Sequence, residues 1–145
     1  MLSYESIKKE KLSDHLLRAC LGIECIHAYT LVHDDLPCMD NDELRRGKPT
    51  VWKKYGETMA VLVGDTLQAL GFELLALSRD IRIISEIARA LGDMGVVRGQ
   101  VRDTFLRHDT LTLDELLRLH DEKTGGFIAV SLVIGGLLAG ASDTE

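Results

Sequence analysis

One stretch of the sequence combines side chains that bind metals with side chains that bind anions. Residues 32–50 read VHDDLPCMDNDELRRGKPT, with five carboxylates in the ten positions from Asp34 to Glu43. Three cations follow at once, Arg45, Arg46 and Lys48. Mg²⁺ is usually bound by one or two carboxylates together with substrate phosphates and water, and arginine presents forked donors that match phosphate oxygens. The stretch predicts either a solvated, partly neutralised run of charges or a Mg²⁺ site beside an anion site.

The spacing of these residues depends on the backbone between them. On a helix of about 100° per residue, His27 and Asp34 are separated by only about 20° and share a face. Asp40 would lie about 120° from Asp34 on an ideal helix, so the two acids converge only if the chain leaves α geometry. Pro37 lies between them and predicts that departure. Carboxylates at the end of a helix also face the negative pole of its dipole, which costs about 0.3–1 kcal/mol each when exposed.

Four helical stretches are expected to position these side chains. They cover about residues 13–36, 57–77, 81–105 and 112–139. Ser13 or Asp14 is the predicted N-cap of the first helix, and Thr112 and Glu115 have the spacing of a capping box. Long helices with short loops predict a single all-α domain, an antiparallel helical bundle.

Composition limits the classes of partner and compartment. The net charge of −6 argues against a nucleic-acid partner, which would require a basic face. The three cysteines form no C-x-x-C pair, and the polar N-terminal sequence does not resemble a signal peptide. These features favour a reducing, cytoplasmic location.

Residues 124–142 contain no charged side chain and are almost long enough to span a bilayer. A helix buried within a bundle has the same composition, with glycines where its neighbours approach closely. Since the rest of the chain is amphipathic, we expect a buried helix and no membrane span.

Several motifs together resemble one enzyme family. HAYTLVHDDLPCMDNDELRRGKPTVWKKYGE, followed by AVLVGDTLQALGFELLA, is similar to the first aspartate-rich region of trans-prenyl diphosphate synthases. The form DDLPCMD resembles farnesyl and geranylgeranyl diphosphate synthases most. GQVRD at 99–103 and EKTGGFIAVSLVIGGLLAG at 122–140 also resemble family motifs, so that the similarity covers about residues 12–141.

The resemblance implies the fold and the reaction. The family fold is an all-α bundle of the isoprenoid synthase type around a deep cavity, and this chain would form about half of it. Members join isopentenyl diphosphate to an allylic diphosphate head-to-tail with Mg²⁺ as cofactor. By this resemblance Asp34 and Asp40 would bind Mg²⁺, with Asp35 beside them as a helper.

The same resemblance implies roles for the cations and their neighbours. Arg45 would grip the allylic diphosphate, and Arg46 the isopentenyl diphosphate, which His27 would also face. Lys123 would reach the allylic diphosphate, and Thr124 would lie near the carbocation. Without the resemblance, His27 is more simply a core histidine and Lys123 a surface lysine with a buried stem.

Three further residues have both a family role and an ordinary one. Gln100 and Asp103 match the family's third-helix motif and would line or support the cavity, although a solvated pair three residues apart is the simpler interpretation. Tyr29 lies five positions before Asp34. It would cap the cavity floor and limit the product to farnesyl length, or it is a core tyrosine with a hydrogen-bonded hydroxyl.

The chain also departs from the family pattern. No Gly-Lys-Arg stretch occurs between Met1 and His27, and no second aspartate-rich motif follows residue 124. The uncharged part of the helix at 112–139 and apolar faces such as that of Leu62, Leu70 and Leu74 would then lack a covering partner, so we expect a homo-oligomer or a second chain that supplies the missing helices. Three hypotheses remain open: an enzyme completed in that way, a non-catalytic diphosphate-binding or regulatory subunit, and an inactive fragment of a full-length synthase.

Overall fold

The computed structural model describes residues 14–105 and 111–142. The chain falls into two compact units. One unit spans Leu17–Leu77, and the other combines Ser78–Glu145 with the start of the chain up to Leu16.

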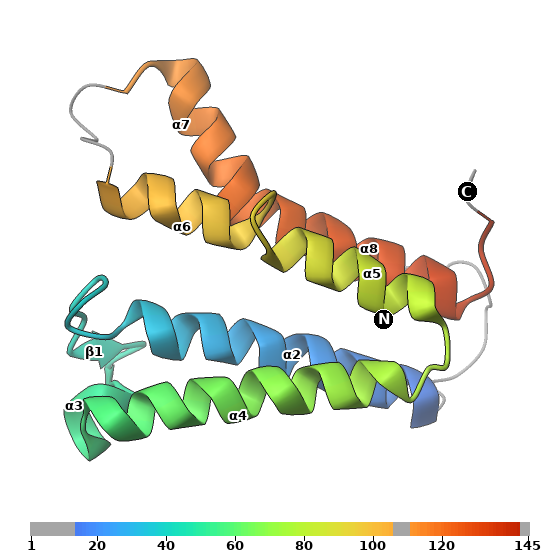
Figure 1. Cartoon of the computed structure of the whole chain (residues 1–145), viewed down its shortest axis with the longest axis horizontal. Helices are drawn as coiled ribbons and strands as arrows, with labels where there is room; N and C mark the ends of the chain where they lie inside the picture. The colour runs from blue at the N-terminus through green and yellow to red at the C-terminus, as the bar shows by residue number, and fades with distance from the viewer. Residues whose placement is uncertain (1–13, 106–110, 143–145) are drawn as a thin grey trace. The chain divides into compact units, whose positions relative to one another are not determined.

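The Leu17–Leu77 unit is built on two long helices that run side by side (Figure 1). Helix α2 covers Asp14–Asp34 and helix α4 covers Glu57–Ala76. The helices predicted over 13–36 and 57–77 are therefore confirmed, although Ser13, one of the two predicted N-caps, lies outside the described residues. The buried positions of α4 are Ala60, Gly64, Gly71 and Leu75. Their spacing places them on one face of the helix.

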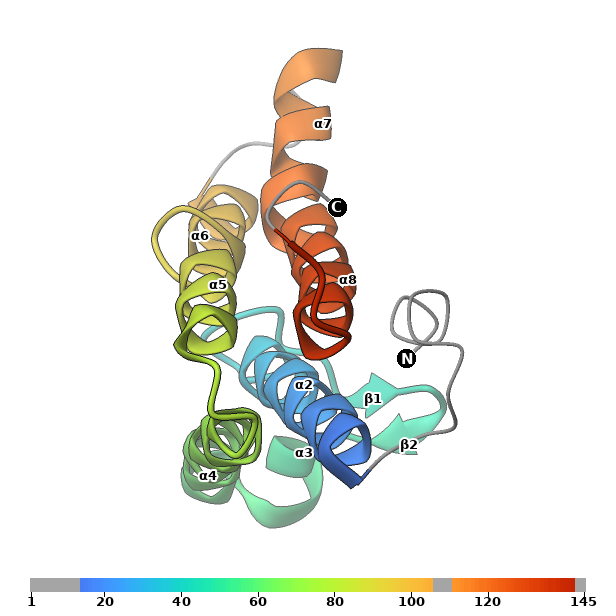
Figure 2. The same cartoon turned by 90° about the vertical axis from the view of Figure 1, so that its right-hand side faces the viewer.

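A short hairpin and a short helix connect α2 to α4. Strand β1 (Leu44–Arg45) pairs antiparallel with strand β2 (Lys48–Pro49), as Figure 2 shows, and helix α3 covers Val51–Tyr55. The turn residues Arg46 and Gly47 have φ values of 53° and 75°. Positive φ at both turn positions produces the tight turn that suits the twist of a two-stranded ribbon. The sequence predicts helices only, so this hairpin is an element that it does not anticipate.

In the other unit the chain forms two helices where one is predicted. Helix α5 covers Ile81–Leu91 and helix α6 covers Val96–Phe105, with a turn between them. The prediction of one helix over 81–105 is therefore wrong. Gly92 has an extended backbone, with ψ of −153°, and glycine lowers the cost of leaving a helix.

The segment predicted as the last helix is helical from Leu113 to Leu138, but its middle forms a π-helical turn. Helix α7 (Leu113–His120) leads through a π-helical turn, η2 (Asp121–Gly125), into helix α8 (Gly126–Leu138). The predicted capping box is confirmed, because Thr112 and Glu115 exchange side-chain to backbone hydrogen bonds. Figure 1 shows the change of direction between α7 and α8, which a π-turn can cause.

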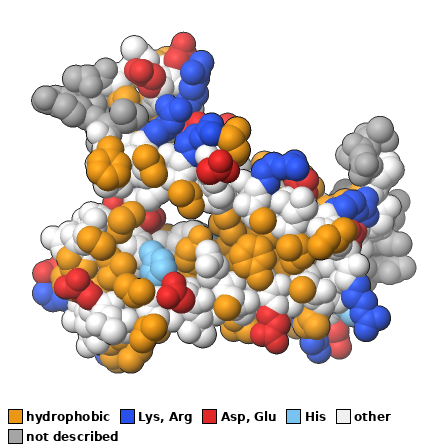
Figure 3. Space-filling view, viewed as in Figure 1, with side chains coloured by type: hydrophobic (Ala, Val, Ile, Leu, Met, Phe, Trp, Pro, Cys, Tyr) orange, Lys and Arg blue, Asp and Glu red, His pale blue; other side chains and the backbone are white. Residues whose placement is uncertain are grey.

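Helix α8 packs against α5 and buries Val130, Ile134 and Gly135. The expected buried helix is confirmed for the face that packs on α5, whereas Ile128 and Leu132 on another face are more than half exposed, at 59% and 58%. On the other unit, Leu62 of α4 is also 55% exposed, and Figure 3 shows apolar side chains spread over the surface formed by this helix.

Within the described residues, α4 is the one helix long and apolar enough to cross a membrane. A single such helix is weak evidence, and α4 also carries Asp65 and Glu73. The expectation of no membrane span stays a prediction.

Candidate functional site

Asp34 and Asp40 lie at the two ends of a closed loop. Helix α2 ends at Asp34, and residues 35–40 form consecutive turns around Pro37. The backbone N–H of Asp40 donates a hydrogen bond of 2.8 Å to the carbonyl oxygen of Asp34. The chain thus leaves α geometry where Pro37 makes continuation unfavourable, and the backbones of Asp34 and Asp40 are brought into contact.

Asp35 lies between these acids and faces a different partner. Its side chain is buried, and both carboxylate oxygens accept hydrogen bonds from Arg45. Arg45 Nε lies 3.0 and 3.1 Å from the two oxygens, and Arg45 Nη2 lies 2.6 Å from Oδ1. This hydrogen bonding is the main cause that raises the pKa of Arg45 above its ordinary value. Asp35 therefore holds Arg45, and its proposed help to a metal stays a prediction.

The β1–β2 hairpin carries Arg45 and Arg46 at defined positions. Arg45 pairs with Lys48 across the strands, and Arg46 is an exposed residue of the turn. The hairpin is fastened by the carbonyl oxygen of Asp42, which accepts from Thr50 Oγ1 at 2.8 Å and from Trp52 Nε1 at 2.7 Å. The hairpin thus brings Arg45 into direct contact with Asp35 of the acidic loop.

Two ring side chains of α2 lie before the acids. His27 is half-buried and lies two helical turns before Asp34 on the same face. Tyr29 is only 8% exposed, and burial raises the pKa of its hydroxyl, a rise that a hydrogen bond with Gln68 opposes. Both interpretations of Tyr29, a cavity floor and a hydrogen-bonded core tyrosine, are compatible with this position.

The other unit holds the remaining predicted site residues around η2. Lys123 of this π-turn forms an ion pair with Asp103 of α6. Glu122 and Arg102 form a second pair between the same two elements, with 2.8 Å between Glu122 Oε2 and Arg102 Nε. Thr124 is exposed on η2. Single π-turns within helices occur often at functional sites.

Gly99 allows η2 to approach α6 this closely. A Cβ on Gly99 would lie 2.4 Å from the backbone nitrogen of Lys123 and 2.5 Å from its Cα. Gln100, the next residue, has a buried Nε2 atom without a hydrogen-bond partner among the described residues. A buried amide donor without a partner costs about 1–3 kcal/mol, so Gln100 is a polar group that a ligand could satisfy.

Asp34 and Asp40 of the Leu17–Leu77 unit fit a Mg²⁺ site in which the substrate supplies the remaining ligands. Within the described parts of the chain, no group of three or more His, Cys, Asp or Glu side chains is placed to hold a metal ion. Mg²⁺ does not require such a group, because it is commonly held by one or two carboxylates plus substrate phosphates. Asp34 and Asp40, joined through their backbones, supply oxygen ligands of that kind.

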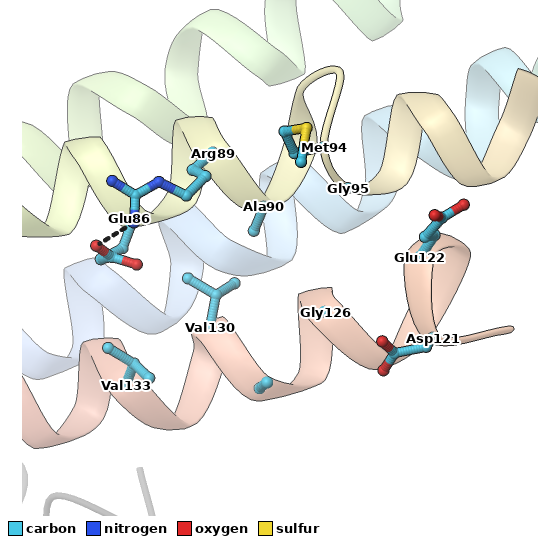
Figure 4. Close-up of a pocket in the computed structure, with 11 residues that line it drawn as sticks. Glu86, Arg89, Ala90, Met94, Gly95, Asp121, Glu122, Gly126, Val130 and Val133 are labelled. Carbon is cyan, nitrogen blue, oxygen red and sulfur yellow. Dashed lines mark hydrogen bonds and ion pairs between the residues drawn. The ribbon is translucent and has the colours of Figure 1, made fainter. Parts of the chain in front are cut away.

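A pocket of about 310 Å³ lies in the Ser78–Glu145 unit, between α5, η2 and α8 (Figure 4). Its lining includes apolar side chains such as Ala90, Met94 and Val130. Its charged residues are Glu86, Arg89, Asp121 and Glu122. Arg89 is paired with Glu86, and Glu122 is paired with Arg102 of α6. None of the predicted site residues lines this pocket.

The structure therefore groups the predicted site residues in two sets, one in each unit. Asp34, Asp40 and Arg45 lie around the acidic loop, and Lys123 and Asp103 lie at η2. Sequence reasoning missed the contact of Asp35 with Arg45 and the role of Gly99. The sequence did offer a signal for this contact in Gly99, the first residue of GQVRD, because a glycine inside a helix often marks a close approach of another backbone.

Comparison with known proteins identifies the family. The sequence matches the polyprenyl synthetase family over residues 1–145. It is 47% identical over 131 residues to a farnesyl diphosphate synthase of Geobacillus stearothermophilus, covering 85% of this chain and 44% of that protein. It is also 43% identical over 140 residues to geranylgeranyl pyrophosphate synthase 11, chloroplastic, of Arabidopsis thaliana, covering 89% of this chain and 39% of that protein.

Solved structures agree with the sequence comparison. A geranyltransferase of Helicobacter pylori, complexed with magnesium and isoprenyl diphosphate, matches with a TM-score of 0.87 and 35% identity. The match covers 99% of this chain and 52% of that one. The chain thus spans about two fifths to one half of the relatives that it matches. Its all-α fold corresponds to about half of an isoprenoid synthase, and the chain belongs to the polyprenyl synthetase family.

Proposed function

We propose that this chain is the part of a trans-prenyl diphosphate synthase that binds Mg²⁺ and the allylic diphosphate for head-to-tail condensation with isopentenyl diphosphate. The observation that carries the proposal is the loop closed between Asp34 and Asp40, which joins two carboxylate-bearing residues through a 2.8 Å hydrogen bond. Membership of the polyprenyl synthetase family supports the substrate class. The magnesium and isoprenyl diphosphate in the Helicobacter pylori structure support the cofactor.

Each charged residue has a defined task in this proposal. Bound Mg²⁺ would stabilise the charge that develops on the departing diphosphate. Asp34 and Asp40 hold the ion, and Arg45, oriented by Asp35, contacts the allylic diphosphate. Lys123 exchanges its contact with Asp103 for the same diphosphate.

Four further residues complete the proposed site. Arg46 and His27 bind isopentenyl diphosphate, Gln100 donates its unpaired amide to a bound ligand, and Thr124 lies near the carbocation. A short, farnesyl-length product follows if the buried Tyr29 forms the cavity floor.

Turnover by the whole enzyme requires helices beyond those of this chain. Because the chain spans about half of its solved relatives, we propose that a second copy or a second chain completes the cavity. The alternatives are a subunit that binds diphosphates without turnover and an inactive fragment of a longer synthase. A cytoplasmic location stays a prediction.

The test uses the purified chain with Mg²⁺, isopentenyl diphosphate and geranyl diphosphate. Diphosphate release and product length are measured for the unaltered chain and for Asp34→Ala and Asp40→Ala. The matched control is Asp42→Ala, which removes one exposed carboxylate from the same stretch but keeps the backbone carbonyl that Thr50 and Trp52 use.

The outcomes separate the three hypotheses. Turnover that falls at least about 100-fold in Asp34→Ala and Asp40→Ala, but not in Asp42→Ala, supports an enzyme whose metal site is the closed loop. Mg²⁺-dependent diphosphate binding without turnover supports a binding subunit or a fragment. No Mg²⁺-dependent binding, or equal effects of all three substitutions, contradicts the proposed site.

A further inference from the structure

Helices α2 and α4 cross with a regular pairing of residues. A Cβ on Gly22 would lie 2.9 Å from the carbonyl oxygen of Gly71, and a Cβ on Gly71 would lie 2.5 Å from Ile26 Cγ1. Tyr29 contacts Gln68 one helical turn further along. Residue numbers rise on α2 as they fall on α4, so the helices are antiparallel and the contact continues toward the acidic loop.

His33 forms the last contact of this series. A Cβ on Gly64 would lie 2.0 Å from His33 Nε2 and 2.3 Å from Cδ2. The imidazole therefore occupies the space that any side chain at position 64 would fill. Tyr29, one turn earlier on α2, packs edge-on against the same ring with 5.7 Å between ring centroids.

A hydrogen bond fixes the ring in this notch. His33 Nε2 lies 3.1 Å from the carbonyl oxygen of Val61. Since a carbonyl only accepts, Nε2 carries the hydrogen and donates it. Asp65 Oδ1 lies 3.9 Å from the same nitrogen, which is too long for a hydrogen bond.

The contact of His33 with α4 lies in the last turn of α2, which carries Asp34. The last four carbonyl groups of a helix lack the normal partners, so a final turn frays unless other contacts hold it. His33 is the residue before Asp34, the last residue of α2. The amide of Asp35 donates to Leu31 at 3.1 Å, and that of Leu36 donates to His33 at 3.2 Å. The second bond ends on the carbonyl of His33 itself, and the first spans it, so a shift of His33 would disturb both.

We propose that His33, seated in the notch that Gly64 leaves on α4, is a positioning residue that fixes the last turn of α2 and thereby the direction of the Asp34 carboxylate. The inference rests on the proposed function of Asp34 as a Mg²⁺ ligand. Groups that orient a metal ligand typically change metal affinity by about 10–100-fold when they are removed.

The test compares two ways of removing the contact with a matched control. Gly64→Ala displaces the ring, His33→Ala removes it, and the double variant does both. Gly71→Ala disturbs the same helix crossing two turns away from His33, where its Cβ would meet Ile26 and Gly22. His33→Gln keeps an N–H donor and tests rescue. Binding of Mn²⁺ in the presence of inorganic diphosphate is measured by electron paramagnetic resonance of free Mn²⁺.

We expect His33→Ala and Gly64→Ala to raise the Mn²⁺ midpoint about tenfold or more. The double variant should resemble His33→Ala, because the substitution at 64 acts through the ring. His33→Gln should recover part of the affinity, and Gly71→Ala should bind as the unaltered chain does. Unchanged affinity in His33→Ala, or an equal loss in Gly71→Ala, would overturn the inference.

A second readout separates this inference from the proposed function. If the unaltered chain binds no Mn²⁺ with diphosphate, the proposed function fails, whereas the order of the turn is still read by hydrogen exchange. The amides of Asp35 and Leu36 should then exchange at least about tenfold faster in His33→Ala than in Gly71→Ala. Equal exchange in these two variants would sink the positioning role of His33 as well.

Discussion

The contact between Asp35 and Arg45 links stability to the proposed site. Asp35 is 3% exposed, whereas the Arg45 side chain is about one-third exposed, at 34%. A buried carboxylate is tolerated only when it is paired or hydrogen-bonded. The arginine is therefore needed for folding of the acidic loop as well as for the proposed binding of diphosphate.

Arg45→Leu is expected to destabilise the Leu17–Leu77 unit by about 1–3 kcal/mol, because it leaves the Asp35 carboxylate buried without its partner. Urea unfolding, followed by the fluorescence of the single tryptophan, measures the change. Trp52 is a suitable reporter because its indole N–H bonds to Asp42 within the hairpin connection. The double variant Asp35→Asn, Arg45→Leu should recover part of the loss, and equal stability of Arg45→Leu and the unaltered chain would contradict the prediction.

The stability of the unit that includes Ser78–Glu145 is expected to depend on pH through Asp80. It is the N-cap of α5, and its pKa is lowered mainly by the hydrogen bond from the Arg82 side chain. A carboxyl with a lower pKa in the folded state stabilises that state above its unfolded pKa, near 3.9, and loses this contribution as the pH falls through the folded value. We expect unfolding curves of Asp80→Asn, which keeps a capping oxygen, to lose part of this dependence below about pH 5. An identical pH dependence in both proteins would argue against a role for the charge.

Among the helices, the contact of α6 with η2 depends on one glycine. Gly99→Ala would place a methyl group 2.4 Å from the backbone of Lys123, and backbone cannot move aside as a flexible side chain can. We expect a loss of about 1–3 kcal/mol in unfolding free energy, as for other overpacked contacts, together with faster amide exchange in η2.

Gly126→Ala is the matched control for Gly99→Ala. A Cβ on Gly126 would meet its nearest atom, the carbonyl oxygen of Asp121, at 3.6 Å, which is ordinary contact. Alanine has a higher helix propensity than glycine by about 0.8–1.0 kcal/mol, so this variant should be neutral or more stable. Similar losses in both variants would indicate a general sensitivity of the π-turn and not a close contact at Gly99.

Helical periodicity identified the long elements but not their interruptions. It predicted 57–77 almost to the residue, because the buried residues of α4 recur on one face from Ala60 to Leu75. It extended one helix from 81 to 105, since the apolar spacing continues past Gly92 while the backbone turns there. The π-turn at Asp121–Gly125 does not interrupt the apolar periodicity of the sequence. It packs against Gly99 of α6, which is distant in the sequence, so periodicity could not reveal it.

At the scale of the whole molecule, the sequence identified the family and the types of residue in the site. The spacing of Asp34, Pro37 and Asp40 predicted a break in the helix, and the loop closes as that break requires. The partner of Asp35 could not be predicted, because the tight turn at Arg46 and Gly47, which brings Arg45 back to the acids, requires a positive φ at Arg46, a conformation that residues other than glycine seldom adopt.

The exposed apolar side chains of α8 predict that the chain associates with itself. Ile128 and Leu132 are four residues apart and more than half exposed, so they form one apolar face. Covering each of these partly exposed side chains contributes about 1–1.5 kcal/mol, roughly half of the value for full burial. We expect light scattering to give a mass of at least two chains of 16.1 kDa, and Leu132→Glu to shift it toward one chain. Leu113→Glu, at a 70% exposed position on α7, is the control and should leave the mass unchanged. A single-chain mass at all concentrations would contradict self-association and leave two alternatives, a second polypeptide that completes the cavity or a fragment of a longer synthase.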